Sequence, residues 1–161
     1  IEPIIMAPKS YTKLENNLMM FYLGGTHSAS SILKEQSANL KGVNKAKVQK
    51  QMCNITRTLK DELQKNNIDA MGELLHENWI LKKSLASGIS NPLVDDVYEK
   101  AIAAGAIGGK LLGAGGSGFM LFYVPEKNQN SVRDGLFGLR EMDFKMDNSG
   151  ASIIHFDKDF I

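Results

Sequence analysis

The segment from Gly108 to Gly118 constrains the fold of this 161-residue chain more than any other. Six of its eleven residues are glycine, and an unbroken apolar run, Phe119–Val124, follows it directly. Glycine permits positive φ and leaves backbone N–H groups uncovered, which is how a polypeptide holds a phosphate. The segment is therefore predicted to be a phosphate-facing loop that connects a helical stretch to a buried strand.

Two common nucleotide motifs are excluded by their context. Gly113, Gly115 and Gly118 have G-x-G-x-x-G spacing, but that fingerprint must follow a strand and open a helix. Here the helical stretch precedes the loop and the apolar run follows it. A Walker loop fails because Lys110 is followed by Leu111 instead of Ser or Thr.

Composition excludes several classes of partner. Lys and Arg total 19 against 18 Asp and Glu, so no basic field favours nucleic acid or an anionic membrane surface. No apolar run reaches the roughly 18 to 20 residues needed to span a bilayer. The single Cys53 rules out an internal disulfide and is expected to be buried. We expect a cytoplasmic protein without nucleic-acid or membrane partners.

Apolar periodicity predicts the elements before the loop. A strand buried on both faces is expected at 18–23, and a polar turn opening a helix at 26–36. Two pairing helices are expected next, one from Val48 to Asn66–Asn67 and one from Asp69 to Ser87–Gly88. The start of the chain, 1–5, has the character of a strand already in progress, which suggests that the chain is part of a longer protein.

The second half of the chain predicts a helix, the loop and a strand–helix–strand unit. Asn91 is a good N-cap and Pro92 suits the first helical position, and Gly105 offers a left-handed stop. A strand at 118–124, a helix at about 129–140 and a last strand through 153–156 complete the pattern. The whole is an α+β chain with a split β-α-β sheet backed by helices.

Several segments together resemble the GHMP superfamily of small-molecule kinases. The stretch 109–119 is similar to the third conserved motif of that superfamily. His76–Trp79, Leu81–Leu85, Gly88–Pro92 and Tyr98–Glu99 resemble the branch that phosphorylates D-glycero-D-manno-heptose phosphates. The similarity covers most of the chain.

This resemblance implies a ferredoxin-like antiparallel sheet and a role as the C-terminal domain of a two-domain kinase, with residues 1–161 forming that domain. The N-terminal domain of such kinases carries an ATP loop of the form P-x-x-x-G-L-G-S-S-A, which these 161 residues do not contain. ATP, Mg²⁺, a sugar phosphate and an N-terminal kinase domain of the same polypeptide are the implied cofactors and partners. The catalytic base and metal ligands are expected in that other domain, so the chain alone is expected to be inactive.

The resemblance also assigns site residues. Lys110 and the loop are expected to shape the phosphate and substrate site, the loop residues being Gly113, Ala114, Gly115, Gly116, Ser117 and Gly118. Ser117 departs from the family pattern, where glycine is common. Further sugar-phosphate contacts are expected from His27, His76 and Lys83; His27 stands where related heptose kinases often carry a cation such as Arg.

Two other functions stay open at the level of sequence. The chain is compatible with a stand-alone ferredoxin-like module that binds a small ligand or has a regulatory role without catalysis. It is also compatible with a GHMP kinase that acts on a different small alcohol. A substitution of Gly115 by Val is expected to reduce turnover and to leave the fold intact, because a β-branched residue tolerates positive φ poorly.

Overall fold

The computed structural model describes residues 3–25, 34, 37–38, 43–147, 150 and 153, and these form an α+β fold. Its antiparallel sheet has the strand order β2-β3-β1-β4. The strands are β1 (Leu18–Gly24), β2 (Gly108–Leu111), β3 (Gly118–Tyr123) and β4 (Arg140–Glu141). Helices separate β1 from β2 and β3 from β4, so the predicted ferredoxin-like arrangement is confirmed.

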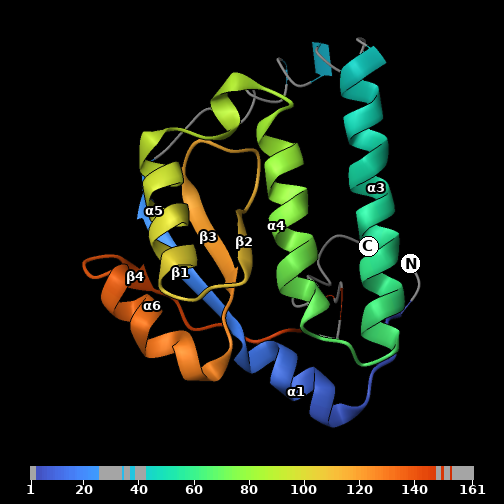
Figure 1. Cartoon of the computed structure of the whole chain (residues 1–161), viewed down its shortest axis with the longest axis vertical. Helices are drawn as coiled ribbons and strands as arrows, with labels where there is room; N and C mark the ends of the chain where they lie inside the picture. Colours follow the sequence, from blue (N-terminus) through green and yellow to red (C-terminus); the bar gives the residue numbers. More distant parts are fainter. Residues whose placement is uncertain are drawn as a thin grey trace, which may run out of the picture.

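Helices cover one face of this sheet (Figure 1). Helix α5 (Pro92–Ala103) lies across β1 and β3, and α4 (Ala70–Lys83) lies along β2. Helix α3 (Val43–Gln64) pairs with α4 as predicted, and α6 (Gln129–Gly135) contacts α5. No helix in the described part of the chain is long and apolar enough to cross a membrane.

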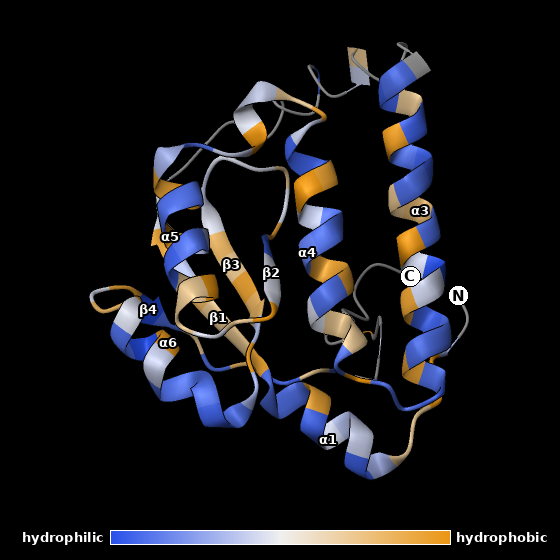
Figure 2. Ribbon diagram, in the orientation of Figure 1, coloured by the Kyte–Doolittle hydropathy of each residue, from blue (hydrophilic) through white to orange (hydrophobic). Residues whose placement is uncertain are grey.

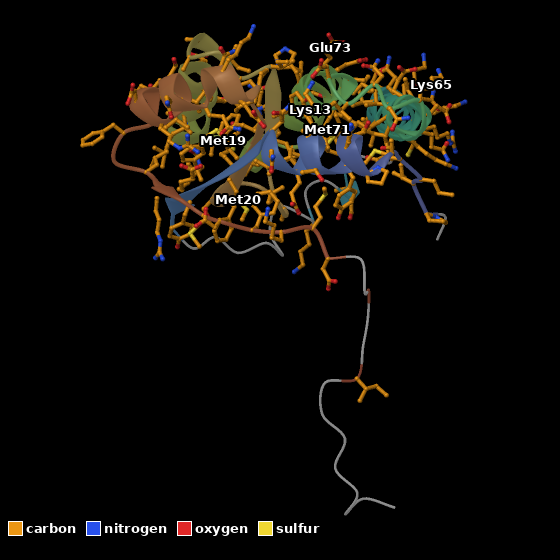
Figure 3. The ribbon with its side chains drawn as sticks, turned by 90° about the horizontal axis from the view of Figure 1, so that it is seen from below. Lys13, Met19, Met20, Lys65, Met71 and Glu73 are labelled. Carbon is orange, nitrogen blue, oxygen red and sulfur yellow. The ribbon has the colours of Figure 1, made fainter. Side chains whose placement is uncertain are left out.

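Strand β1 is central in the sheet, but the expectation that both its faces are buried is wrong. Met19, Phe21 and Leu23 are buried against the helices, whereas Tyr22 is 38% exposed. Figure 3 shows Met19 on the helix side of β1 and Met20 on the opposite side. Burial along β1 therefore alternates between the two faces of the sheet, as is usual for an antiparallel sheet.

The predicted ends of α3 and α4 are confirmed in part. Helix α3 ends before Asn66, which has a φ of 65°. Helix α4 ends at Lys83, earlier than expected, because the chain turns at Ser84 and forms the short 3-10 helix η1 (Ser87–Ile89).

Apolar residues lie along α3 between polar ones (Figure 2). Cys53 of α3 is exposed, so its predicted burial is wrong.

The C-terminal part differs from the sequence prediction. Helix α6 ends at Gly135 instead of about 140, and Gly138, with a φ of 92°, lies where the chain turns back into β4. Strand β4 pairs with β1 at Tyr22 and Phe21 and forms the edge that the last strand was expected to supply. Of the residues 153–156, only Ile153 is described, and it is 84% exposed and outside any strand.

The N-terminal part also differs. The described residues 3–7 form no strand, and Ile5 is 73% exposed. Helix α1 (Pro8–Asn16) follows, with Pro8 at its start, and it was not predicted. Apart from residue 34, the helix expected at 26–36 lies outside the described residues.

Candidate functional site: the glycine-rich hairpin

The glycine-rich segment is a β-hairpin, and its first part is a strand instead of a loop. Gly108–Leu111 pairs with β3 as β2, and Leu112 donates its amide to the carbonyl of Phe119 at 2.8 Å. The loop itself is therefore 112–117, and Lys110 lies on β2, half-buried and in register with Leu121. In Figure 1 this loop lies at the same end of the fold as the C-terminal end of α4.

The predicted positive φ values are confirmed at four glycines of the hairpin. They are 75° at Gly113, 129° at Gly115, 79° at Gly116 and 107° at Gly118. At Gly115 a side chain would also collide with another segment, because a Cβ there would lie 2.6 Å from the Cα of Ile89. Glycine at 115 is thus required both by backbone conformation and by the close approach of η1.

Hydrogen bonds attach the loop to the segment between α4 and α5. Gly116 donates its amide to the carbonyl of Ile89 at 3.1 Å, and Asn91 Nδ2 donates to the carbonyl of Gly116 at 2.6 Å. The other side-chain atom of that amide, Asn91 Oδ1, accepts from the amide of Val94 at 3.1 Å and caps α5, as predicted. One asparagine therefore orients both the loop and the adjacent helix.

A lysine of α4 holds the other side of the loop. Lys82 Nζ donates to the carbonyl of Gly113 at 2.7 Å. Burial, and then the positive charge of Lys110, lower the pKa of Lys82 to about 8. No local sequence pattern predicts this contact between Lys82 and the loop.

Several amides of the loop remain available to a ligand. The amide of Gly116 is used by Ile89, but those of Gly113, Ala114, Gly115 and Ser117 donate to no group in the described part of the chain. Gly113 is exposed, whereas Gly115 and Gly116 are buried. A turn of consecutive N–H groups with glycine at positive φ is an arrangement that binds anions.

The end of β1 lies beside this loop. Gly24 is in register with Gly118, and a Cβ at Gly25 would lie 3.4 Å from the Cβ of Ser117. The side chain at Ser117 is therefore accommodated next to a glycine of the neighbouring strand end. His27, which was expected to contact the sugar phosphate, lies outside the described residues.

His76 is not brought to the loop. It lies six residues before Lys82 on α4, about 9 Å along the helix axis. His76 Nδ1 is 2.7 Å from the hydroxyl of Tyr98, which also accepts the amide of Gly109. Burial raises the pKa of Tyr98 to about 12, so the hydroxyl stays protonated at neutral pH and shares a hydrogen bond with Nδ1. The histidine therefore belongs to a contact that joins α4, α5 and β2.

Lys83, the third expected sugar-phosphate contact, is already paired. Its Nζ lies 3.0 Å from Asp95 Oδ1 and 5.9 Å from the centre of the Trp79 ring. Ser90 Oγ donates to the same carboxylate oxygen at 2.9 Å. Trp79 is fully buried in the core, so Lys83 lies between a core side chain and an acidic residue of α5.

Metal ligands are not grouped in the described residues. No set of three or more His, Cys, Asp or Glu side chains there is arranged to hold an ion. The loop amides and lysines fit the phosphates of a nucleotide or sugar phosphate. We assign no metal ligand to the described residues.

The described chain is thus a ferredoxin-like α+β domain with a glycine-rich hairpin at one end. Residues 59–140 match the family model of the GHMP kinases C terminal domain. The chain belongs to that family.

Known relatives differ in their substrates. The chain is 26% identical over 123 residues to a D-glycero-alpha-D-manno-heptose 7-phosphate kinase of Campylobacter jejuni, an alignment that covers 76% of the chain and 36% of the relative. It is 38% identical over 71 residues to a mevalonate kinase of Methanothermobacter thermautotrophicus, covering 44% and 23%. The crystal structure of L. major mevalonate kinase matches with a TM-score of 0.68 at 19% identity, covering 74% and 37%. The matched part is thus well under half the length of each of these proteins.

Proposed function

We propose that the chain is the C-terminal domain of an ATP-dependent kinase that phosphorylates a small alcohol, and that the acceptor is a heptose phosphate. The observation that carries the proposal is that the amides of Gly113, Ala114, Gly115 and Ser117 have no partner among the residues that the structure describes. Membership of the GHMP kinase family supports the reaction class. The similarity to a heptose 7-phosphate kinase over three quarters of the chain supports the acceptor.

The hairpin has the properties that phosphoryl transfer requires of a protein. The reaction depends mainly on alignment of donor and acceptor and on stabilisation of charge at the phosphate oxygens. Amides that are already oriented need no reorganisation when that charge develops. The bonds of Gly116 to Ile89 and Asn91 provide this orientation, and Lys110 adds positive charge nearby.

The remaining parts of the machinery are proposed to lie outside these 161 residues. GHMP kinases use ATP and Mg²⁺, and an N-terminal kinase domain of the same polypeptide would hold them together with the catalytic base. When bound to ATP, Mg²⁺ neutralises charge on the phosphate oxygens. The role of this chain is to place the loop amides against a phosphate of the donor or the acceptor.

The test compares two glycines in the full-length protein. Gly113 and Gly138 both have positive φ, at 75° and 92°, and a Cβ at either would meet no atom within 4 Å. We expect Gly113→Val to lower kcat with ATP and heptose 7-phosphate at least tenfold, and Gly138→Val, which carries similar backbone strain away from the loop, to leave it unchanged. ADP release is the measurement.

The outcomes separate the parts of the proposal. Absence of ADP release with any acceptor contradicts the kinase assignment and favours a ligand-binding module. Release with mevalonate but not with heptose 7-phosphate contradicts the acceptor alone. Equal kcat for Gly113→Val and the unmodified protein contradicts the role of the loop.

A further inference from the structure

Two lysines lie near the hairpin loop without an acidic partner. Lys82 of α4 donates to the carbonyl of Gly113, and Lys110 of β2 carries the charge that acts on Lys82. Neither has a carboxylate at ion-pair distance among the residues that the structure describes. Like charges held together without a counter-ion destabilise the folded state, so this arrangement suits an anion supplied from outside.

The charged pair that follows Lys82 along the chain is already engaged. Lys83, the next residue of α4, is bound to Asp95 of α5, and that carboxylate also accepts from Ser90. Among the described residues, Lys110 is the only charged group that lowers the pKa of Lys82. Asp95, the first acidic residue of α5, is therefore not available to neutralise Lys82.

We propose that the amines of Lys82 and Lys110 bind one phosphate dianion together with the amides of Gly113 and Ala114, which donate to no group in the described part of the chain. This proposal rests on the proposed function, in that the phosphate belongs either to the acceptor or to the nucleotide. Ammonium groups and backbone amides both donate to phosphate oxygens, and charge-assisted bonds of this kind are stronger than neutral ones. Lys82 then has two roles, as the anchor of the Gly113 carbonyl and as a ligand of the phosphate.

The alternative is that Lys82 only anchors the loop. An anchor needs a donor to the Gly113 carbonyl, and a neutral amine also supplies one. A phosphate ligand needs the positive charge, which Lys82 loses as pH rises through about 8. The pH dependence of anion binding, and its behaviour when Arg replaces Lys82, therefore distinguish the two roles.

The experiment titrates the full-length protein with sulfate by calorimetry between pH 7 and pH 9, because the charge of sulfate is constant in this range. We expect binding to weaken as pH rises. We expect Lys82→Met and Lys110→Met to weaken it at least tenfold at pH 7, and Lys82→Arg to retain binding at pH 9. Lys100→Met is the control, since Lys100 is exposed and paired with Asp96 on the outer side of α5.

Several results would overturn the proposal: equal affinity for sulfate in Lys82→Met and the unmodified protein, or equal loss in Lys82→Met and Lys82→Arg. The amide signals of Gly113–Ser117 in NMR spectra check that the loop remains folded in each variant. Competition of sulfate with ATP and with heptose 7-phosphate then identifies which of them carries the bound phosphate. If sulfate binding depends on the lysines but no ADP is released, the phosphate site is supported and the kinase assignment is contradicted. If ADP is released but sulfate binding does not depend on the lysines, only the proposed phosphate site is contradicted.

Discussion

Gly115 lies directly against the backbone of Ile89, so that a Cβ at 115 would be 2.6 Å from the Cα and 2.9 Å from the carbonyl oxygen of Ile89. Backbone atoms cannot move aside as the end of a flexible side chain can. This contact joins the hairpin to η1 and changes the expectation for Gly115→Val, because the substitution affects the fold as well as the loop.

Substitution of Gly115 by Ala is expected to destabilise the protein by about 2 to 5 kcal/mol. The φ of 129° costs about 1 to 2 kcal/mol for a residue with a side chain, and the overlap with Ile89 adds about 1 to 3 kcal/mol. Urea denaturation measures the difference. The matched control is Gly138→Ala, which has a φ of 92° and open space around the Cβ, and should lose only the conformational part. Equal losses of stability in the two variants would show that η1 shifts and relieves the overlap at no cost in free energy.

Asn91 is expected to show two separable roles. Asn91→Ala removes the cap of α5 and the bond to the Gly116 carbonyl, and should cost about 1 to 2 kcal/mol in urea denaturation. Asn91→Asp keeps an acceptor for the Val94 amide but loses the donor to Gly116. It should therefore retain most of the stability and still lower kcat. If Asn91→Asp has unchanged kcat, the bond to Gly116 does not position the loop.

The sequence predicted the loop and the second strand of the hairpin, but not its first strand. Positive φ at the loop glycines follows from composition, and the apolar run after Gly118 indicated β3. Strand β2 was missed because it starts with Gly108 and Gly109, which have low β propensity. The structure explains these glycines, since a Cβ at Gly108 would collide with the carbonyl oxygen of Gly72 in α4. The requirement comes from a helix 36 residues away, which no local pattern reveals.

The site residues show the same limit. Asn91 was identified as a cap from its position before Pro92, but its second bond crosses 25 residues to Gly116. Lys82 reaches Gly113 across 31 residues, a contact that no local pattern reveals. His76 and Lys83 were proposed from the resemblance, whereas their contacts with Tyr98 and Asp95 bind the helices together. Local patterns thus predict backbone conformation, and tertiary contacts decide which side chains reach the loop.

Stability is expected to rise with pH between about 8 and 10.5 because of Lys82. Its pKa is about 8 in the folded protein and has an ordinary value of 10.5 when unfolded. In this range the unfolded chain binds more protons than the folded one, so increasing pH favours folding. Below pH 8 Lys82 is charged in both the folded and the unfolded protein. The free-energy penalty for holding this charge in the folded protein is then fully present.

Lys82→Met should remove this part of the pH dependence. The variant is expected to gain stability relative to the unmodified protein at pH 7 and to lose that advantage near pH 10, as measured by urea denaturation at each pH. Lys100→Met, at an exposed ion pair, is the control and should follow the unmodified protein. A constant difference across the range for Lys82→Met would mean that the charge of Lys82 is not penalised in the fold.

Tyr123 is expected to contribute stability through a buried contact at the other end of the sheet. Asn17 Nδ2 donates to the Tyr123 hydroxyl at 2.9 Å, and the hydroxyl donates to Asp69 Oδ1 at 2.6 Å. Burial, and then the bond to Asp69, raise the pKa of Tyr123 above its ordinary value, so the hydroxyl remains a donor through neutral and mildly alkaline pH. The contact joins the start of β1 to the end of β3 and the start of α4.

Tyr123→Phe should therefore cost about 1 to 3 kcal/mol, because Asn17 is only 1% exposed and its amide group would lose its acceptor without gaining water. Its Oδ1 atom already has no hydrogen-bond partner, so the second loss leaves the whole side-chain amide unpaired. Tyr22→Phe is the control, since Tyr22 is 38% exposed and should change stability by less than about 0.5 kcal/mol. Urea denaturation compares them. Equal stability of the two variants would show that Asn17 finds another partner when the hydroxyl is removed, and the joint between β1, β3 and α4 would then depend on apolar packing alone.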